Sequence, residues 1–325
     1  MRDLKWLTIY EYFYKQSGIE FFFYSRNLSY LLNFETEKRA DKVYKRFKSI
    51  AYEMIDVDIA NLTKTWTKNL MTNYDYLMYL NRLSNRSFND ITRYPIFPWV
   101  ISDYSNEELK INNKIQYRDF SKPIGTINQA SYEKALKLYE YLDTDPIPIK
   151  KPFHFFTYIS NPGYIIFFYT RQVPSLILKL QSGAFGPNDR IFKSFESLWN
   201  QMHTGLTQFT ELIPEFYSLN KSHILMNKYN LDFGNNQHGE QINDVGMARW
   251  SNSMEDFMFK MKSALESEHC SLNLHTWIDL IFGYKQKGRE AVKCANIFNE
   301  TCYKENYENM NTKSQLKLSA LKLQI

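Results

Sequence analysis

The sequence predicts a mainly α-helical protein, in which a multihelical body with long irregular and extended segments follows a β-hairpin and a helix. Three observations predict this class. Two short runs of aromatic and aliphatic residues near the N-terminus are typical of β-strands. Most later segments repeat apolar residues at the helical period. Prolines and stretches rich in Asn and Gly interrupt those segments, and these residues favour irregular backbone.

The predicted hairpin lies within residues 19–34. Residues 19–24 and 28–34 are its strand-like runs, and residues 25–27 supply the turn. A helix is predicted over residues 36–50, because apolar residues recur there at helical spacing. Those residues are Ala40, Val43, Tyr44, Phe47 and Ile50, and Thr36 precedes them as an N-cap. Two strands and one helix are too few to fold stably alone.

Local signals place further helices in the body. Thr72 and Asp75 have capping-box spacing, which predicts that a helix begins there. Its inward-facing residues are expected to be Tyr74, Leu77 and Met78. Two prolines within residues 94–99 predict an extended, buried segment. Other helices are predicted at 131–142, within 163–180 with a break at Pro174, at 191–202, and from Ser253 to about His269, whereas 143–152 and 227–252 are predicted to be irregular.

The last predicted helix ends in a basic turn. Leu274, Trp277, Ile278 and Ile281 recur at helical spacing and predict one wide apolar face against a core. Gly283 stands where a helix C-terminus often needs a left-handed residue, and lysines follow it. We therefore predict a buried helix that ends at a left-handed Gly283.

Composition indicates a soluble protein with a large core. Apolar residues make up 44% of the 325 residues, and charged residues 23%. Aromatic residues reach 17%, which predicts an interior rich in rings or, alternatively, an exposed aromatic groove. Three cysteines without a C-x-x-C pair suit a reducing compartment. Residues 1–5 do not resemble a signal peptide, and the longest apolar run, residues 164–169, is too short to span a bilayer. We expect a cytoplasmic protein.

The net charge of +5 is concentrated in two segments. Residues 36–50 contain six basic and two acidic side chains, and residues 304–325 contain four basic and two acidic ones. The remaining chain is close to neutral, which argues against a nucleic-acid partner.

No catalytic motif is complete. Asp232-Phe-Gly234 copies a kinase triplet, but no H-R-D loop or glycine-rich loop with its lysine precedes it. Gly283 and Gly288 have Walker-A spacing, yet Arg-Glu follows where Lys-Ser/Thr is required. The six histidines form no H-E-x-x-H pair, and no G-x-S-x-G elbow occurs. We predict no catalytic residues, no metal site and no cofactor.

A dense polar cluster next to aromatic residues is the candidate partner-binding surface. Its residues are Asn81, Arg82, Asn85, Arg86, Asn89 and Asp90, followed by Tyr94 and Trp99. Aromatic anchors beside arginine are typical of interface hot spots. Alternatively, these groups bond to one another within an irregular fold.

The basic segment 36–50 is a candidate lipid-contact surface, with Lys42, Lys45 and Arg46 on its outer face. A solvated helix face is the alternative reading, because apolar penetration is not evident from this helix. The last segment, residues 310–325, is rich in Lys, Leu and Ser and is either a frayed helix or disordered.

Several segments resemble one protein family. Trp277-Ile-Asp-Leu-Ile-Phe-Gly-Tyr-Lys-Gln286 is similar to the signature of the BEACH (Beige and Chediak-Higashi) domain. Further similar segments, in the family's order, are 73–90, 94–104, 118–128, 211–217 and 232–250. Residues 19–50 resemble the last strands and the C-terminal helix of the PH-like domain that precedes BEACH domains. We therefore expect a partial PH-like domain at 1–50, a BEACH domain at 51–303 and a tail at 304–325.

The resemblance implies a non-enzymatic scaffold or adaptor in membrane trafficking, acting in vesicle fusion and fission, lysosome size or autophagy. It implies protein partners at cytosolic membrane faces, a peripheral location on endomembranes, and packing of the PH-like piece against the BEACH body beside a groove. The alternative is direct binding of anionic membranes through residues 36–50, and an enzyme ranks third. Two features depart from the family: residues 244–250 lack the usual Leu-Pro before Trp, and the usual Phe-Gly-Gln-x-Pro segment is missing.

Overall fold

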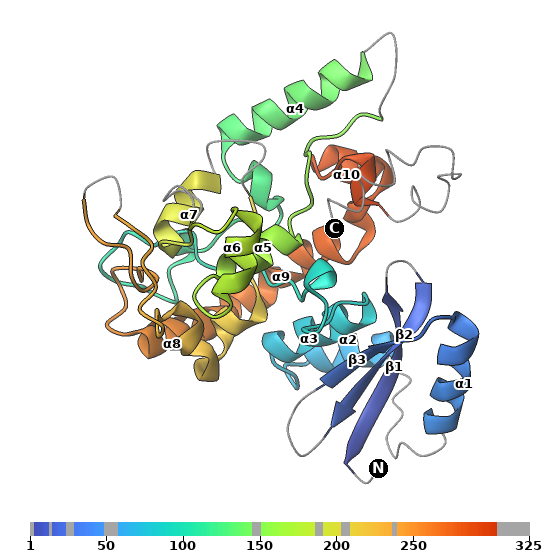
Figure 1. The fold of residues 1–325 in the computed structure, drawn as a ribbon. Coiled ribbons are helices and arrows are strands. Elements are labelled where there is room, and N and C mark those ends of the chain that lie inside the picture. Colours follow the sequence, from blue (N-terminus) through green and yellow to red (C-terminus); the bar gives the residue numbers. More distant parts are fainter. Residues whose placement is uncertain are drawn as a thin grey trace. The chain divides into compact units, whose positions relative to one another are not determined.

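The computed structural model describes residues 3–12, 15–23, 29–48, 58–144, 151–185, 191–202, 209–235 and 239–303 (Figure 1). The predicted turn at 25–27, most of the connector 143–152, His203, His238 and the tail 304–325 lie outside these residues. The chain divides into two compact units, residues 1–95 and residues 96–325. The domain boundaries predicted at 50 and 303 stay predictions.

The first unit begins with a three-stranded antiparallel sheet in the order β1-β2-β3. Its strands are β1 (Leu4–Tyr12), β2 (Lys15–Phe23) and β3 (Ser29–Asn33), and helix α1 (Glu37–Lys48) follows. The predicted hairpin corresponds to β2 and β3, and the predicted helix to α1. Strand β1 was not predicted.

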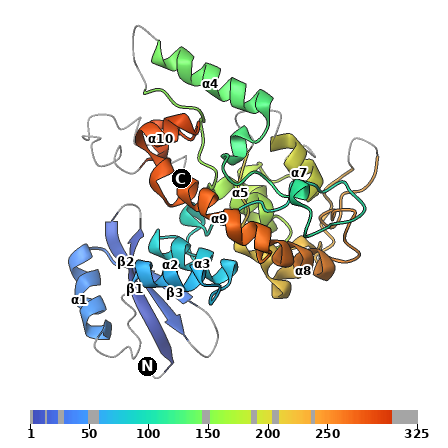
Figure 2. The same ribbon diagram turned by 180° about the vertical axis from the view of Figure 1, so that it is seen from behind.

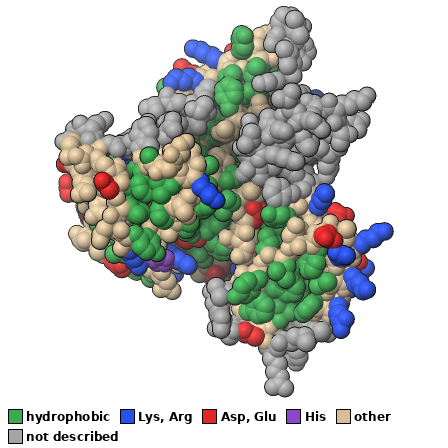
Figure 3. Space-filling view, viewed as in Figure 1, with side chains coloured by type: hydrophobic (Ala, Val, Ile, Leu, Met, Phe, Trp, Pro, Cys, Tyr) green, Lys and Arg blue, Asp and Glu red, His purple; other side chains and the backbone are tan. Residues whose placement is uncertain are grey.

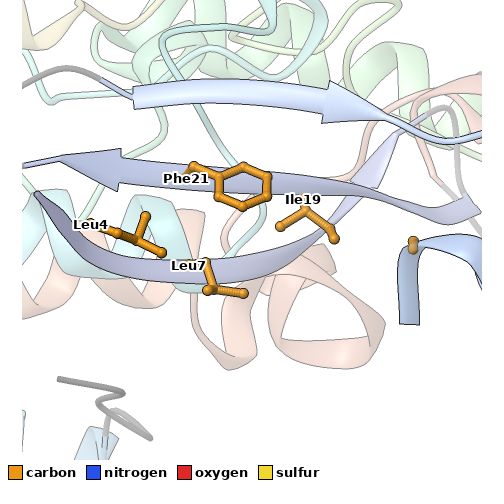
Figure 4. Close-up of a cluster of buried hydrophobic side chains, with 5 residues drawn as sticks. Leu4, Leu7, Ile19 and Phe21 are labelled. Atoms are coloured by element: carbon orange, nitrogen blue, oxygen red, sulfur yellow. The ribbon is translucent and has the colours of Figure 1, made fainter. Parts of the chain in front are cut away.

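One face of this sheet and the inner face of α1 form a small core (Figure 4). The pairing of Leu7 with Phe21 and the alternation along β2 point Leu7, Ile19 and Phe21 to the same side. Ala40 from α1 and Leu4 complete the buried cluster. Burial of each large apolar side chain contributes about 2 kcal/mol. The sheet therefore gains its stability from the helix that covers it.

Two helices and a turn follow on the other side of the sheet from α1 (Figures 1 and 2). They are α2 (Ile59–Thr67), α3 (Asn73–Leu83) and the 3-10 turn η1 (Ile91–Arg93). Thr72 caps α3 by accepting a hydrogen bond from the Asp75 backbone N–H at 3.0 Å, as predicted. Tyr76 is buried in place of Tyr74, and it stacks on Trp66 at 4.3 Å.

The second unit is multihelical, with extended segments between short helices. The α-helices are α4 (Gln129–Asp143), α5 (Pro162–Phe168), α6 (Pro174–Leu180), α7 (Phe195–Met202), α8 (Met254–Leu265), α9 (Glu268–Ile281) and α10 (Gly288–Lys293). The 3-10 turns are η2 (Lys114–Gln116), η3 (Ile124–Thr126), η5 (Pro214–Tyr217), η6 (Leu219–Leu225), η7 (Tyr284–Gln286) and η8 (Glu300–Cys302). The predicted fold class is confirmed.

Aromatic rings fill the core of the second unit. Phe195 lies 4.5 Å from Phe257 and 5.0 Å from Phe216, measured between ring centroids. Trp250 stacks on Phe257 at 5.2 Å. The prediction of a ring-rich interior is therefore confirmed.

Among the described residues, no helix is both long and apolar enough to cross a membrane.

Two predictions near the C-terminus were wrong. The helix that begins after Ser253 ends at Leu265, and Ser267 caps a separate helix, α9, by accepting from the Cys270 N–H at 3.2 Å. Gly283 is not left-handed, since its φ is −104°. A Cβ atom on Gly283 would lie 2.8 Å from Asp279 Cα. Glycine is required there because the backbone after α9 passes close to the helix itself.

Candidate functional site

The candidate partner-binding surface lies mainly in the first unit. Asn81, Arg82, Arg86, Asn89, Asp90 and Tyr94 follow one another from the end of α3 through η1. Trp99 belongs to the second unit, where its side chain is fully buried. The structure thus brings together six of the seven predicted residues.

Most polar groups of this segment bond to neighbours within the unit. Asn81 is fully buried, and its amide donates to the Leu77 carbonyl at 2.9 Å. Arg86 Nη1 donates to the Tyr94 carbonyl at 2.8 Å. Asp90 accepts from the Thr92 N–H at 2.9 Å and so caps η1. These contacts fix the path of the chain from α3 to η1.

The sheet supplies the other bonding partners. Glu20 Oε1 accepts from Ser87 Oγ at 2.6 Å, Asn89 Nδ2 at 3.1 Å and Ser29 Oγ at 2.8 Å. The Arg82 guanidinium lies 5.2 Å from the centre of the Phe22 ring. Glu20 is therefore the point where a strand and the polar loop after α3 meet.

Burial and charge shift two pKa values here. Tyr10 donates to Asp90 Oδ2 at 3.2 Å, and burial together with the Asp90 charge raises the pKa of the Tyr10 hydroxyl. Burial lowers the pKa of Arg82. Arg93 and Glu11 form an ion pair at 3.4 Å. Polar groups of the sheet and of the loop are thus paired across their contact, Tyr10 with Asp90 and Glu11 with Arg93.

Three large apolar side chains in this segment stay exposed. Leu83, Phe88 and Ile91 expose 41%, 42% and 41% of their surface. Tyr94, predicted as an aromatic anchor, is buried and forms an edge contact with Phe88 at 5.6 Å. A partner that reaches this surface would meet Phe88 rather than Tyr94.

Sequence reasoning missed Glu20, and a signal for it was present. Glu20 is an acidic residue between Ile19 and Phe21, within the apolar run of residues 19–23. A carboxylate in such a position is costly unless hydrogen-bonded, so it requires donors from elsewhere in the fold. The exposure of Phe88 and Ile91 had no comparable signal.

Trp99 is one of three residues that donate hydrogen bonds to a buried carboxylate, that of Glu211, in the second unit. Glu211 accepts from Arg118 Nη1 at 2.7 and 2.9 Å, from the Trp99 backbone N–H at 3.0 Å and from Trp277 Nε1 at 2.9 Å. The Trp99 indole N–H donates to the Thr210 carbonyl at 2.7 Å. Arg118 and Glu211 are both buried. We name Trp99, Arg118, Glu211 and Trp277 the carboxylate centre.

Each member of the carboxylate centre comes from a different segment that resembles the BEACH family. These segments are 94–104, 118–128, 211–217 and 277–286. Removal of one member would leave a charge or a donor buried without its partner, at a cost of several kcal/mol. The segments that resemble the family are therefore the ones that supply the interactions of the carboxylate centre.

Residues Lys42, Lys45 and Arg46 are exposed on α1, as predicted. Lys45 pairs with Asp41 at 2.7 Å.

Across the described ranges, no three His, Cys, Asp or Glu side chains come close enough together to hold a metal ion. Asp232 accepts from the Gly234 N–H at 2.9 Å, so the kinase-like triplet forms a turn.

Comparison with known proteins identifies relatives. The Beige/BEACH domain family model matches residues 64–325. Beige protein homolog 1 of Saccharomyces cerevisiae is 41% identical over 251 residues, which are 76% of this chain and 12% of that protein. BEACH domain-containing protein B of Arabidopsis thaliana is 34% identical over 338 residues, 97% of this chain and 13% of that protein.

BEACH domain-containing protein lvsD of Dictyostelium discoideum is 39% identical over 254 residues, covering 77% of this chain and 8% of that protein. The chain thus spans only a small part of the length of these relatives. The match covers both the polar loop after α3 and all four members of the carboxylate centre. The chain belongs to the BEACH domain family.

Proposed function

We propose that this chain is a non-enzymatic scaffold or adaptor that binds protein partners in membrane trafficking, in vesicle fusion or fission, lysosome size control or autophagy. Family membership supports this proposal, because BEACH proteins commonly act in membrane trafficking. The observation that carries it is the carboxylate centre. Glu211 is buried and bonded to three donor residues, so it serves the architecture and is not presented to a substrate.

The partner-binding residues are proposed in two roles. Phe88 and Ile91 are exposed and apolar, and Asn89 lies between them, so these three side chains are proposed to contact the partner. Asn81, Arg82, Arg86, Asp90 and Tyr94 are proposed to set the shape of that surface through the contacts described above. Trp99 is proposed to act only through the core of the second unit.

The partial PH-like piece is proposed to support this surface. The hydrogen bonds from Ser87 and Asn89 to Glu20 support an intramolecular contact of the kind that the family resemblance implies. Because the sheet bonds to the loop that carries Phe88, changes in the sheet would alter the surface offered to a partner. We propose that the protein acts on the cytoplasmic side of endomembranes.

Site-specific photocrosslinking tests the proposal. A photoreactive amino acid at position 88 or 91 is expected to give the same discrete protein adduct in cells. Positions 259 and 272 are matched controls, since Phe259 and Leu272 are exposed apolar residues on α8 and α9 of the second unit. Equal adducts from all four positions would show that the surface is not specific.

A cell assay adds a functional readout. In cells that lack the protein, Phe88→Ala/Ile91→Ala is expected to fail to restore lysosome or autophagosome size. The control Phe259→Ala/Leu272→Ala is expected to restore it. Full rescue by the first variant would contradict the proposed surface, and rescue that depended on an added substrate or metal would contradict the non-enzymatic role.

A further inference from the structure

The sheet of the first unit leaves part of an apolar face open. Tyr30 and Leu32 of β3 expose 52% and 50% of their surface. Figure 3 shows an apolar patch over this sheet, facing the viewer. We define the sheet patch as Tyr30, Leu32 and the neighbouring Phe23, whose ring lies 5.8 Å from that of Tyr30.

The strand register explains this exposure. Tyr30 pairs with Phe21 and Leu32 pairs with Ile19, so all four side chains lie on the face that α1 covers. Helix α1 packs on β1 and β2. The apolar face therefore continues beyond the helix onto β3, where half of each side chain remains in contact with solvent.

A basic surface borders the patch. Six exposed Lys and Arg side chains project from α1, against Glu37 and Asp41. Figure 3 shows Lys and Arg side chains along the margin of the patch where α1 lies. Its members are Lys38, Arg39, Lys42, Lys45, Arg46 and Lys48. Asp41 is paired with Lys45, and Arg39 with Glu35, which leaves an excess of positive charge.

We propose that the first unit docks on an anionic lipid bilayer, with the basic face of α1 against headgroups and Tyr30 and Leu32 at the interface. Basic residues alone give weak, salt-sensitive attraction. A tyrosine and an aliphatic side chain beside them add the apolar contact with the acyl region that stable peripheral binding needs. This proposal does not depend on the partner-binding surface around Phe88.

Charge favours a bilayer over a second copy of the chain. A two-fold dimer through the sheet patch would bring the two α1 helices, each with a net charge of +4, to the same interface. Like charges at an interface oppose association. An anionic surface instead complements the basic helix and the apolar patch at once.

Vesicle flotation tests the proposal. The intact chain is mixed with phosphatidylcholine vesicles with or without 30% phosphatidylserine, at about 0.1 M and 0.5 M NaCl. Binding is expected only to anionic vesicles, weaker at high salt but not abolished. Lys42→Gln/Lys45→Gln/Arg46→Gln is expected to lower the partition coefficient roughly a hundredfold, since each basic residue contributes about a fivefold factor.

The patch has its own variants. Tyr30→Ser/Leu32→Ser is expected to lower binding about tenfold and to remove the binding that persists at high salt. Leu32→Asn alone keeps the ring contact between Tyr30 and Phe23. This single variant replaces the double variant in the flotation assay if the double variant unfolds. A cooperative thermal transition like that of the wild type checks the fold.

Matched controls come from the second unit. Tyr229→Ser/Leu180→Ser removes a tyrosine and a leucine that are 64% and 62% exposed. Lys137→Gln/Lys179→Gln/Lys228→Gln removes three exposed lysines. Both controls are expected to bind like the wild type.

Three results would overturn the proposal. The first is no flotation of the wild type with anionic vesicles at low salt. The second is flotation that the patch and helix variants leave unchanged. The third is a dimer in light scattering, without flotation, that Tyr30→Ser/Leu32→Ser dissociates, because this result would assign the patch to a second copy.

Discussion

Arg118 Nη1 lies 2.7 Å from Glu211 Oε1, although the two residues are 93 positions apart and both side chains are buried. Desolvation of two charges is offset only when each finds good partners. Glu211 has the indole of Trp277 and the backbone of Trp99 in addition to the guanidinium. The buried carboxylate of Glu211 thus links four segments that are distant from one another in the sequence.

The first prediction concerns the ion pair between Arg118 and Glu211. Arg118→Met leaves the Glu211 carboxylate buried without its countercharge, so the free energy of unfolding is expected to fall by about 3–5 kcal/mol. Urea unfolding measures it. Lys293→Met is the control, since Lys293 pairs with Glu290 on the surface at 2.6 Å, and little change is expected. Similar losses for both variants would mean that the buried pair has no special role.

The second prediction concerns Glu20. Glu20→Leu leaves Ser87 Oγ and Asn89 Nδ2 without their shared acceptor, so the loop after α3 is expected to lose about 1–3 kcal/mol of local stability. Faster amide hydrogen exchange over residues 85–93 reports it. Glu107→Leu, at an exposed position, is the control. Unchanged exchange in the Glu20 variant would show that the sheet does not support the loop.

The third prediction is a pH dependence. His154 is fully buried against Tyr139, and its Nδ1 accepts from the Ile297 N–H at 3.2 Å. Burial lowers the pKa of His154 from 6.5 to about 4. Between these values the unfolded chain binds more protons than the folded one, so stability falls as pH falls through this window. The loss is expected to reach about 2–3 kcal/mol at pH 4.

Titration of the unfolding free energy from pH 7 to pH 4 measures this loss in the wild type and in His154→Asn. The variant retains an acceptor but does not titrate, so its curve is expected to be shallower. His275→Asn, at an exposed histidine, is the control and is expected to follow the wild type. Parallel curves for wild type and His154→Asn would refute the assignment.

The fourth prediction concerns Gly283. Its missing side chain admits the backbone of Asp279, and a Cβ would meet Asp279 Cα at 2.8 Å. Gly283→Ala is expected to lower the unfolding free energy by about 1–3 kcal/mol, because helix backbone cannot move aside cheaply. At Gly163 an added Cβ meets only the Asn161 side chain, at 3.1 Å. A smaller loss in Gly163→Ala, measured by thermal unfolding, is the expected contrast.

Much of the helical body could be predicted because its signals are local. Thr72 and Ser253 each cap the helix that follows them, and the cap and its N–H partner lie within four residues. Strand β1 was missed because residues 4–12 do not alternate strictly between apolar and polar side chains. The strand forms by pairing with β2, and pairing is not a local property of the sequence.

The candidate site was harder for the same reason. The polar residues after α3 were recognised as a cluster, but Glu20, which Ser87 and Asn89 contact, lies 67 and 69 positions away. Composition alone does not distinguish a polar cluster that bonds internally from one that faces a partner. Trp99 illustrates the same limit, since an aromatic ring suits a core as well as an interface.

The carboxylate centre also constrains how the second unit forms during synthesis. Its members are spread from Trp99 to Trp277, so the centre remains incomplete until the ribosome has released most of that unit. Contacts of such large sequence separation form late and slowly. Until then the Glu211 carboxylate lacks the Trp277 donor. We expect nascent chains that end before residue 277 to bind chaperones, and release to coincide with the emergence of α9.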